Sequence, residues 1–150
     1  MCLAGKVPPG HVPIYFCVRL KTMTCKVYYD EKLHVIENLF TGIVKYDELV
    51  QMFYDVTELA IQKKCYSWIH DFSNAERQIT QAELYKSPKM LSTIVDRLGD
   101  NKKSLKRAIV GKQHMLDLKF AVKIYTDLGF VVQAFDNIDH ARDWITGREK

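Results

Sequence analysis

The spacing of hydrophobic residues changes along the chain from an alternating pattern, typical of strands, to a three-to-four-residue pattern, typical of helices. Apolar runs at 25–29 and 33–40 flank the polar turn 30–32, which predicts two antiparallel strands. Thr41-Gly42 is expected to end the second strand. From Asp47 to Lys64 the spacing is helical, with acidic residues first and lysines last, as the helix dipole favours. The pattern therefore predicts a strand pair followed by a helix.

The run from Tyr66 to Phe72 is mostly aromatic and β-branched, which predicts an inner strand. Asp71, Ser73 and Asn74 follow closely together, and such short polar side chains favour turns because they hydrogen-bond to nearby backbone. We expect this strand to end at Phe72 and a loop to begin there.

The second half of the chain alternates between helical and extended patterns. Thr80 begins a capping box and Ser87-Pro88 is a second helix start, so either two short helices or one kinked helix fits. Further elements are expected at 107–110 (strand), 118–128 (helix), 130–135 (strand) and 138–146 (helix). The last helix is expected to be anchored by Ala141, Trp144 and Ile145, with Trp144 buried. The order ββαβαβαβα predicts an α/β fold with parallel strands and right-handed crossovers.

Residues 1–24 differ in character from the rest because Pro8-Pro9-Gly10 and Pro13 interrupt them. This leader is either partly disordered or contributes an edge strand from Ile14 to Leu20, which would add one strand to the order. Whether translation starts at Met1 or at Met23 is left open. We expect residues 25–150 to form one domain.

Composition narrows the class of protein. The chain has 150 residues, of which 47% are hydrophobic and 27% charged, which is ordinary for one globular domain. The net charge of +4 is spread along the chain. The densest basic cluster, Lys102-Lys103 with Lys106-Arg107, lacks interleaved aromatics, so we expect a solvated loop and no nucleic-acid binding.

The four cysteines include no CxxC pair and no neighbouring histidines at zinc spacing. We expect reduced packing residues, no metal and no cofactor. The chain has no signal-peptide pattern and no apolar run long enough to span a bilayer, which predicts a cytoplasmic protein.

Several segments together resemble the SpoIIAA-like family, whose fold is similar to STAS domains (the anti-sigma-factor antagonists) and which is often described with the lipid-binding CRAL-TRIO class. The matching segments are Phe135-Asp136 with Ala141 and Trp144-Ile145, Thr41-Gly42, Asp71-Phe72-Ser73, and Arg107 to Val110. The resemblance covers about residues 25–146 and implies a STAS-like mixed sheet with helices. Phosphorylated STAS regulators carry a serine switch after the strand that corresponds to 66–72. Residues 73–80 lack its Asp-Ser-Ser-Gly-like start, so phosphorylation of Ser73 is left open.

Polar residues follow the expected parallel strands at their carboxyl ends, where ligands usually bind α/β proteins. The candidate ligand- or partner-binding residues are His70, Asp71, Ser73, Asn74, Lys112 and His114. Turn formation and helix capping explain the same residue types without a site. Asp136 and Asn137 follow the last strand in the same way.

Ser73, His114 and Asp136 are residue types that could form a nucleophilic catalytic set. The sequence has no Gly-x-Ser-x-Gly elbow to accompany them. No glycine-rich phosphate loop is present either. Met52, Phe53 and Tyr54 could line a lipid pocket, although their helical spacing is typical of a core. We therefore expect no catalytic residues.

The favoured hypothesis is a non-enzymatic STAS-like regulatory or interaction module of the bacterial cytosol, acting by protein contact or by binding a small apolar ligand. A lipid-type carrier is the alternative, and a hydrolase using the strand-end cluster is a weaker one. The partner, the ligand, the oligomeric state and a homodimer are left open.

Overall fold

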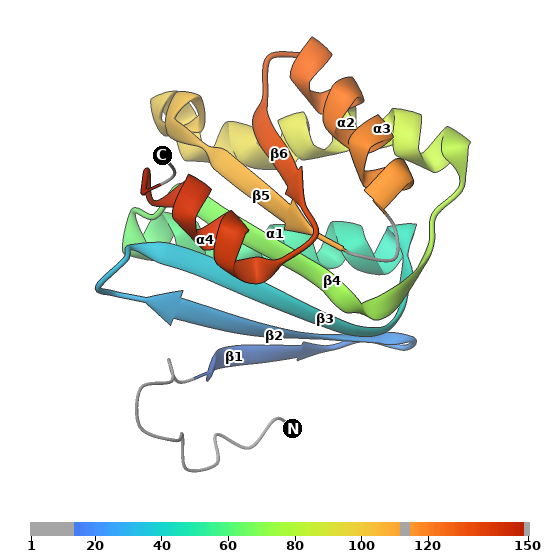
Figure 1. Ribbon diagram of the computed structural model, residues 1–150, viewed down its shortest axis with the longest axis horizontal. Helices are drawn as coiled ribbons and strands as arrows, with labels where there is room; N and C mark the ends of the chain where they lie inside the picture. Colours follow the sequence, from blue (N-terminus) through green and yellow to red (C-terminus); the bar gives the residue numbers. More distant parts are fainter. Residues whose placement is uncertain (1–13, 112–114, 149–150) are drawn as a thin grey trace.

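The computed structural model describes residues 14–111 and 115–148, which form a mixed sheet with helices on both faces (Figure 1). The strands are β1 (Ile14–Arg19), β2 (Met23–Asp30), β3 (Val35–Lys45), β4 (Ser67–Gln78), β5 (Lys106–Val110) and β6 (Val131–Phe135). The helices are α1 (Tyr46–Lys63), α2 (Gln81–Val95), the 3-10 segment η1 (Asp96–Ser104), α3 (Met115–Asp127) and α4 (Ile138–Ile145). The predicted α/β class and element order are confirmed, with the additional leading strand.

The six strands lie in the sheet in the order in which they occur along the chain. β1, β2 and β3 are antiparallel neighbours, whereas β3 to β6 are parallel. Each parallel pair is joined by a helix, as crossover connections require. None of the helices within the described ranges is long and apolar enough to cross a membrane.

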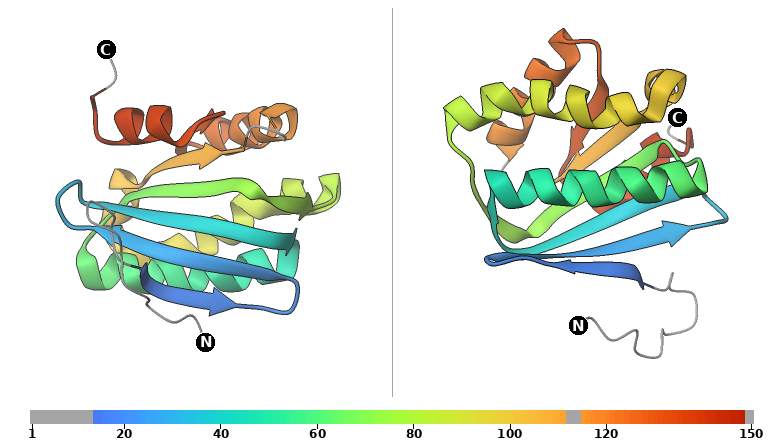
Figure 2. Two further views of the ribbon diagram at one scale, coloured as in Figure 1. Left: turned by 60° about the horizontal axis from the view of Figure 1, so that its bottom comes forward. Right: turned by 180° about the vertical axis from the view of Figure 1, so that it is seen from behind.

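The helices divide between the two faces of the sheet. α1, α2 and α3 cover one face and α4 covers the other (Figures 1 and 2). Alternate residues of each strand therefore enter different cores: Trp68 packs in the large core under α1–α3, and Ile69 packs in the smaller core under α4. β4 is buried on both faces, which explains its nearly continuous apolar run.

β1 lies at the edge of the sheet and extends the large core. Phe16, Val18 and Leu20 are partly buried against that core. The following turn is attached to α1, because the Thr22 backbone N–H donates to Glu48 Oε1 at 2.7 Å and the Thr22 hydroxyl donates to the same carboxylate.

Two strands continue beyond the ends expected from the sequence. β3 runs through Thr41-Gly42 to Lys45, and β4 runs past Phe72 to Gln78, where the two strands remain paired. Gly42 permits this because its φ is +88° and a Cβ there would lie 2.5 Å from the Thr22 carbonyl oxygen. The predicted strand ends were therefore wrong.

The polar cluster after Phe72 forms a β-bulge within the strand rather than a loop. Asp71 pairs with Leu39 and Asn74 with Thr41, so that β4 has one residue more than β3 in this interval. The Asp71 carboxylate accepts a hydrogen bond from the Ser73 backbone N–H at 2.9 Å. This local bond is the one expected of a turn-forming aspartate, but the strand continues around it.

α2 is a single helix that contains Pro88, which settles the choice between one helix and two. The Thr80–Glu83 capping box forms at its start, as predicted. A proline cannot donate to the carbonyl four residues earlier, which is that of Leu84. The Ser87 hydroxyl donates to this carbonyl at 2.7 Å, so the buried oxygen keeps a partner.

α4 is anchored by two of the three residues that were predicted to anchor it. Ala141 and Ile145 are buried, whereas Trp144 is only partly buried. The Trp144 ring lies 5.6 Å from the Phe135 ring, and Lys106 Nζ lies 4.3 Å from its centre. The burial of Ala141 and Ile145 confirms that part of the prediction, whereas the prediction of a buried Trp144 was wrong, because its ring packs beside Phe135 and Lys106 and stays partly exposed.

Replacing Gly42 with alanine is expected to lower the free energy of unfolding by about 2–4 kcal/mol, because it adds backbone strain and a clash with the Thr22 carbonyl. Gly129→Ala is the matched control, since Gly129 also has a positive φ (+91°) but nothing lies within 4 Å of its Cβ position. Its cost is expected to be about 1 kcal/mol. Urea denaturation measures both, and equal losses would contradict a role for the close approach to Thr22.

Candidate functional site

Three polar side chains meet inside the large core, on three neighbouring parallel strands. Asn38 of β3, His70 of β4 and Arg107 of β5 are 0%, 0% and 2% exposed. The Asn38 side-chain amide lies 3.1 Å from His70 Nδ1, and Arg107 Nε donates to His70 Nε2 at 3.2 Å. Asn38 and His70 are also direct register partners. We call this group the buried triad.

The hydrogen bonds determine the protonation of His70. A guanidinium can only donate, so Nε2 accepts and the neutral ring carries its proton on Nδ1. The Nδ1–H needs an acceptor, which Asn38 Oδ1 supplies when the amide is turned by 180°. This assignment also gives a partner to Asn38 Oδ1, which otherwise is buried without one. Burial, and then the Arg107 charge, holds the pKa of His70 well below its ordinary value.

Arg107 is a buried cation among aromatic rings. Its guanidinium carbon lies 5.3 Å from the ring centre of Phe53 in α1 and 4.8 Å from that of Tyr125 in α3. Burial lowers the pKa of the guanidinium, while the neighbouring Tyr125 acts in the opposite direction. Arginine stays charged at neutral pH even so. In the described part of the chain, no carboxylate forms an ion pair with Arg107, and its Nη1 has no hydrogen-bond partner.

Arg107 lines a cavity of about 30 Å³ between the sheet and α1–α3. Most of the wall is apolar, and the described lining residues include no aspartate or glutamate. They are Tyr46, Leu49, Phe53, Phe72, Arg77, Ile79, Leu84, Ser87, Arg107, Ile109, Leu118, Ala121 and Tyr125. A cavity of this volume has room for about two water molecules. We call it the Arg107 cavity.

Comparison with known proteins establishes the fold of the chain. No protein-family model matches the sequence. No curated protein matches it either. Among solved structures, the chain is similar to an anti-sigma factor antagonist from Mycobacterium paratuberculosis, with a TM-score of 0.55 and 16% sequence identity. The match covers 85% of this chain and 96% of that one. The chain has a STAS-like fold.

The STAS-like sheet does not bring the expected site residues together. His70 is buried under α1–α3, and Asp71 points to the opposite face of the same strand. Ser73 and Asn74 are exposed beside the bulge. Lys112 and His114 lie outside the described residues. The structure therefore assigns His70 to an interior site and separates it from the exposed residues.

The strand-end nucleophilic set is also dispersed across the sheet. Ser73 lies on β4 and Asp136 follows β6, with β5 between them. Two strand spacings amount to about 10 Å, which is too far for a hydrogen bond between the two side chains. His114 lies outside the described residues.

The two free thiols of the described chain, Cys25 and Cys65, are both buried. Cys17 is disulfide-bonded, so the expectation that the cysteines are reduced was wrong for this residue. Burial, with a smaller effect of Asp55, raises the pKa of the Cys25 thiol to about 12. A thiol with that pKa is almost fully protonated at neutral pH and is a poor nucleophile. Cys25 therefore contributes packing.

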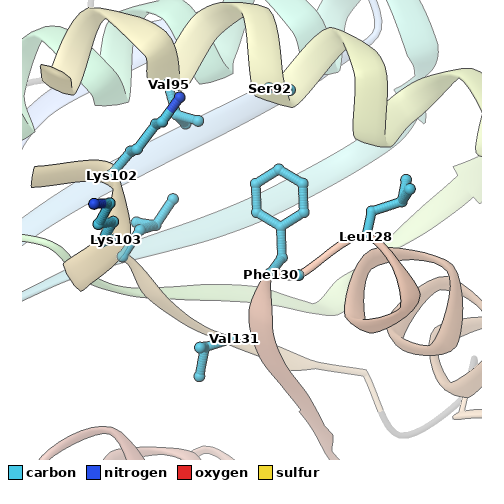
Figure 3. Close-up of a pocket in the computed structure, with 9 residues that line it drawn as sticks. Ser92, Val95, Lys102, Lys103, Leu128, Phe130 and Val131 are labelled. Atoms are coloured by element: carbon cyan, nitrogen blue, oxygen red, sulfur yellow. The ribbon is translucent and has the colours of Figure 1, made fainter. Parts of the chain in front are cut away.

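A second hollow lies beside the amino ends of strands β5 and β6. This groove has a volume of about 270 Å³ and includes Ser92 and Val95 from α2 (Figure 3). Its other lining residues are Lys102, Lys103, Leu105, Leu128, Gly129, Phe130 and Val131. Figure 3 shows the Phe130 ring between the two lysines and Leu128. We call it the Leu128 groove.

Sequence reasoning missed Arg107, which was expected in a solvated basic loop but is buried. The available signal was its position: Arg107 and Ile109 are two apart in a strand, and therefore face the same side. Asn38 could have been found in the same way, because it lies between the inward-facing Ile36 and Phe40. Strand alternation thus identifies buried polar residues that residue type alone assigns to the surface.

The low pKa of His70 predicts that stability falls with acidity. The unfolded ring binds a proton below about pH 6.5 whereas the folded ring does not, so acid favours unfolding. Between about pH 7.5 and 5.5 the free energy of unfolding is expected to fall by about 1.4 kcal/mol. Urea denaturation at each pH measures this change. His70→Gln, which keeps an acceptor for Arg107, should lack this part of the pH dependence. His140→Gln, which changes an exposed ring, should retain it, and identical pH profiles for all three proteins would contradict the account.

Proposed function

We propose that the protein is a non-enzymatic regulatory module of the bacterial cytosol, which acts by contact with a partner protein at the Leu128 groove. The observation that carries the proposal is the exposure of apolar side chains in one hollow. Leu128 and Val131 are 64% and 50% exposed, which makes them two of the three most exposed large hydrophobic residues of the described chain. Exposed apolar surface gathered in a groove is typical of protein-binding sites.

The charge around the groove indicates the chemistry of the partner. Lys102 and Lys103 stand at its side, and Lys102 already pairs with Asp96 at 2.8 Å. Within the described residues Lys103 has no ion-pair partner. A partner segment that inserts an apolar side chain beside Leu128 and presents a carboxylate to Lys103 would complement both features.

The likeness to an anti-sigma factor antagonist supports a role in regulation by protein contact. The interior also favours a binding role over a chemical one, because the ring of His70 is enclosed and has no route to a substrate at the surface. A lipid-type carrier remains a prediction. The Arg107 cavity, at about 30 Å³, would have to enlarge greatly before an acyl chain could enter.

Native mass spectrometry of the full chain, purified from its own host, tests this function. The wild-type protein is expected to carry one other protein in a fixed ratio. Leu128→Asp with Val131→Asp should lose that partner, because a charge in the groove would have to be desolvated on binding. Both residues are exposed, so stability should change by less than about 0.5 kcal/mol.

Tyr54→Asp is the matched control, since Tyr54 is an exposed apolar residue (39%) on α1 outside the groove. It should retain the partner. A wild-type protein that carries no partner, or a groove variant that keeps it, would contradict the proposal.

A further inference from the structure

The strand β6 ends the sheet of the described chain, so one of its two sides has no neighbouring strand there. The Gly111 backbone N–H donates to the Phe135 carbonyl at 3.1 Å, which shows that the backbone groups of Phe135 point toward β5. Because backbone groups alternate in direction along a strand, those of Val132 and Ala134 point away from β5. The N–H and carbonyl groups of these two residues therefore form an open edge.

β6 lacks the features that usually protect an edge strand from further pairing. Its sequence, VVQAF, has no charged residue and no proline. β1, at the other end of the sheet, contains Arg19 and has a register shift between Ile14 and Phe16, and both features disfavour pairing with another strand. β6 is therefore the edge that is more open to an added strand.

We infer that the open edge of β6 pairs with β6 of a second copy of this chain, in an antiparallel and two-fold symmetric contact. The symmetry axis lies at Gln133, because this register pairs all five residues of the strand. Val132 and Ala134 of the second copy then exchange backbone hydrogen bonds, which satisfy the outward N–H and carbonyl groups of both chains.

The side chains that this register brings together are complementary. Val131 is 50% exposed, and it lies on the same face of the strand as Phe135. Each Val131 is placed opposite Phe135 of the second copy, and pairs of β-branched and aromatic residues stabilise neighbouring strands. The Phe135 ring lies 5.6 Å from the partly buried Trp144 ring, so Val131 joins an existing aromatic cluster. The contact covers apolar surface that a single chain leaves in water.

The charges near the two ends of β6 are also complementary. Lys103 is exposed and lines the same groove as Val131, at the amino end of the strand. Asp136 is exposed and directly follows Phe135 at the carboxyl end. Because an antiparallel pair places the amino end of one strand against the carboxyl end of the other, Lys103 approaches Asp136 of the second copy. The chain itself therefore matches the edge in hydrogen bonding, apolar surface and charge.

Sedimentation equilibrium of the full chain, produced in a foreign host and purified to homogeneity, tests this contact. The measured mass should reach twice the 17.5 kDa of one chain as the concentration increases. No other protein is present, so the result does not depend on the partner contact proposed at the Leu128 groove. A chain that stays monomeric up to its solubility limit would overturn the inference and leave that partner contact untouched.

Charge substitution at Gln133 tests the position of the axis. Gln133 is exposed and lies opposite Gln133 of the second copy in this register. Gln133→Glu and Gln133→Lys should each raise the dimer dissociation constant by about threefold to tenfold, because like charges then face each other. An equal mixture should recover wild-type dimerisation, because opposite charges meet. Gln51→Lys is the matched control, since it changes an exposed glutamine on α1 and should dimerise like the wild type.

Ala134→Pro tests the open edge itself. Proline removes the outward N–H and its ring blocks the second strand, whereas the bonds to β5 use Gln133 and Phe135, so this variant should be monomeric. If it does not fold, the Gln133 variants decide the question alone. A folded Ala134→Pro protein that still dimerises would overturn the inference. An unchanged dissociation constant in the Gln133 variants, or a mixture that pairs no better than either variant, would also overturn it.

Discussion

The hydrogen bonds of the buried triad are the constraint on which the rest of the structure depends. They join β3, β4 and β5 on the face that α1–α3 cover, with Asn38 directly opposite His70 and Arg107 two residues before Ile109, the register partner of His70 on β5. A shift of one residue in any of these strands would move its polar group to the other face and leave its partner unsatisfied in the core. The triad therefore specifies the register of the parallel part of the sheet as well as stabilising it.

The triad also explains why the helices pack where they do. Phe53 of α1 and Tyr125 of α3 place their rings beside the Arg107 guanidinium, and Phe53 also meets the His70 ring edge to face at 5.3 Å. The three helices cover a charge as well as an apolar surface. The Arg107 cavity remains at this junction, while the Leu128 groove forms at the far ends of α2 and α3. The helix α2 lines both hollows, but the two hollows share none of their lining residues.

The element order could be predicted from the sequence because hydrophobic spacing reports which faces of helices and strands are buried. The ends of β3 and β4 could not, since Thr41-Gly42 and Asp71-Ser73-Asn74 have the composition of turns. Their extended conformation depends on pairing between strands that are distant in sequence. Pro88 is a similar case, because only the Ser87–Leu84 hydrogen bond shows how the helix continues through it.

The candidate site was harder to predict than the fold. Residue type directed attention to polar groups after the carboxyl ends of strands, whereas the structure gathers Asn38, His70 and Arg107 from within three strands. Each of them follows the inward alternation of its own strand. Their contact depends on the lateral order of the strands, which a single sequence does not specify.

The most direct test of this account is the protonation of His70, measured by two-dimensional ¹H–¹⁵N NMR of the imidazole nitrogens. The account predicts a neutral ring with the proton on Nδ1 at pH 7, which stays neutral in the folded protein at about pH 5.5 because burial and Arg107 oppose protonation. A ring protonated on Nε2, or one that titrates near its ordinary pKa of 6.5, would contradict the Arg107–His70 hydrogen bond and with it the triad.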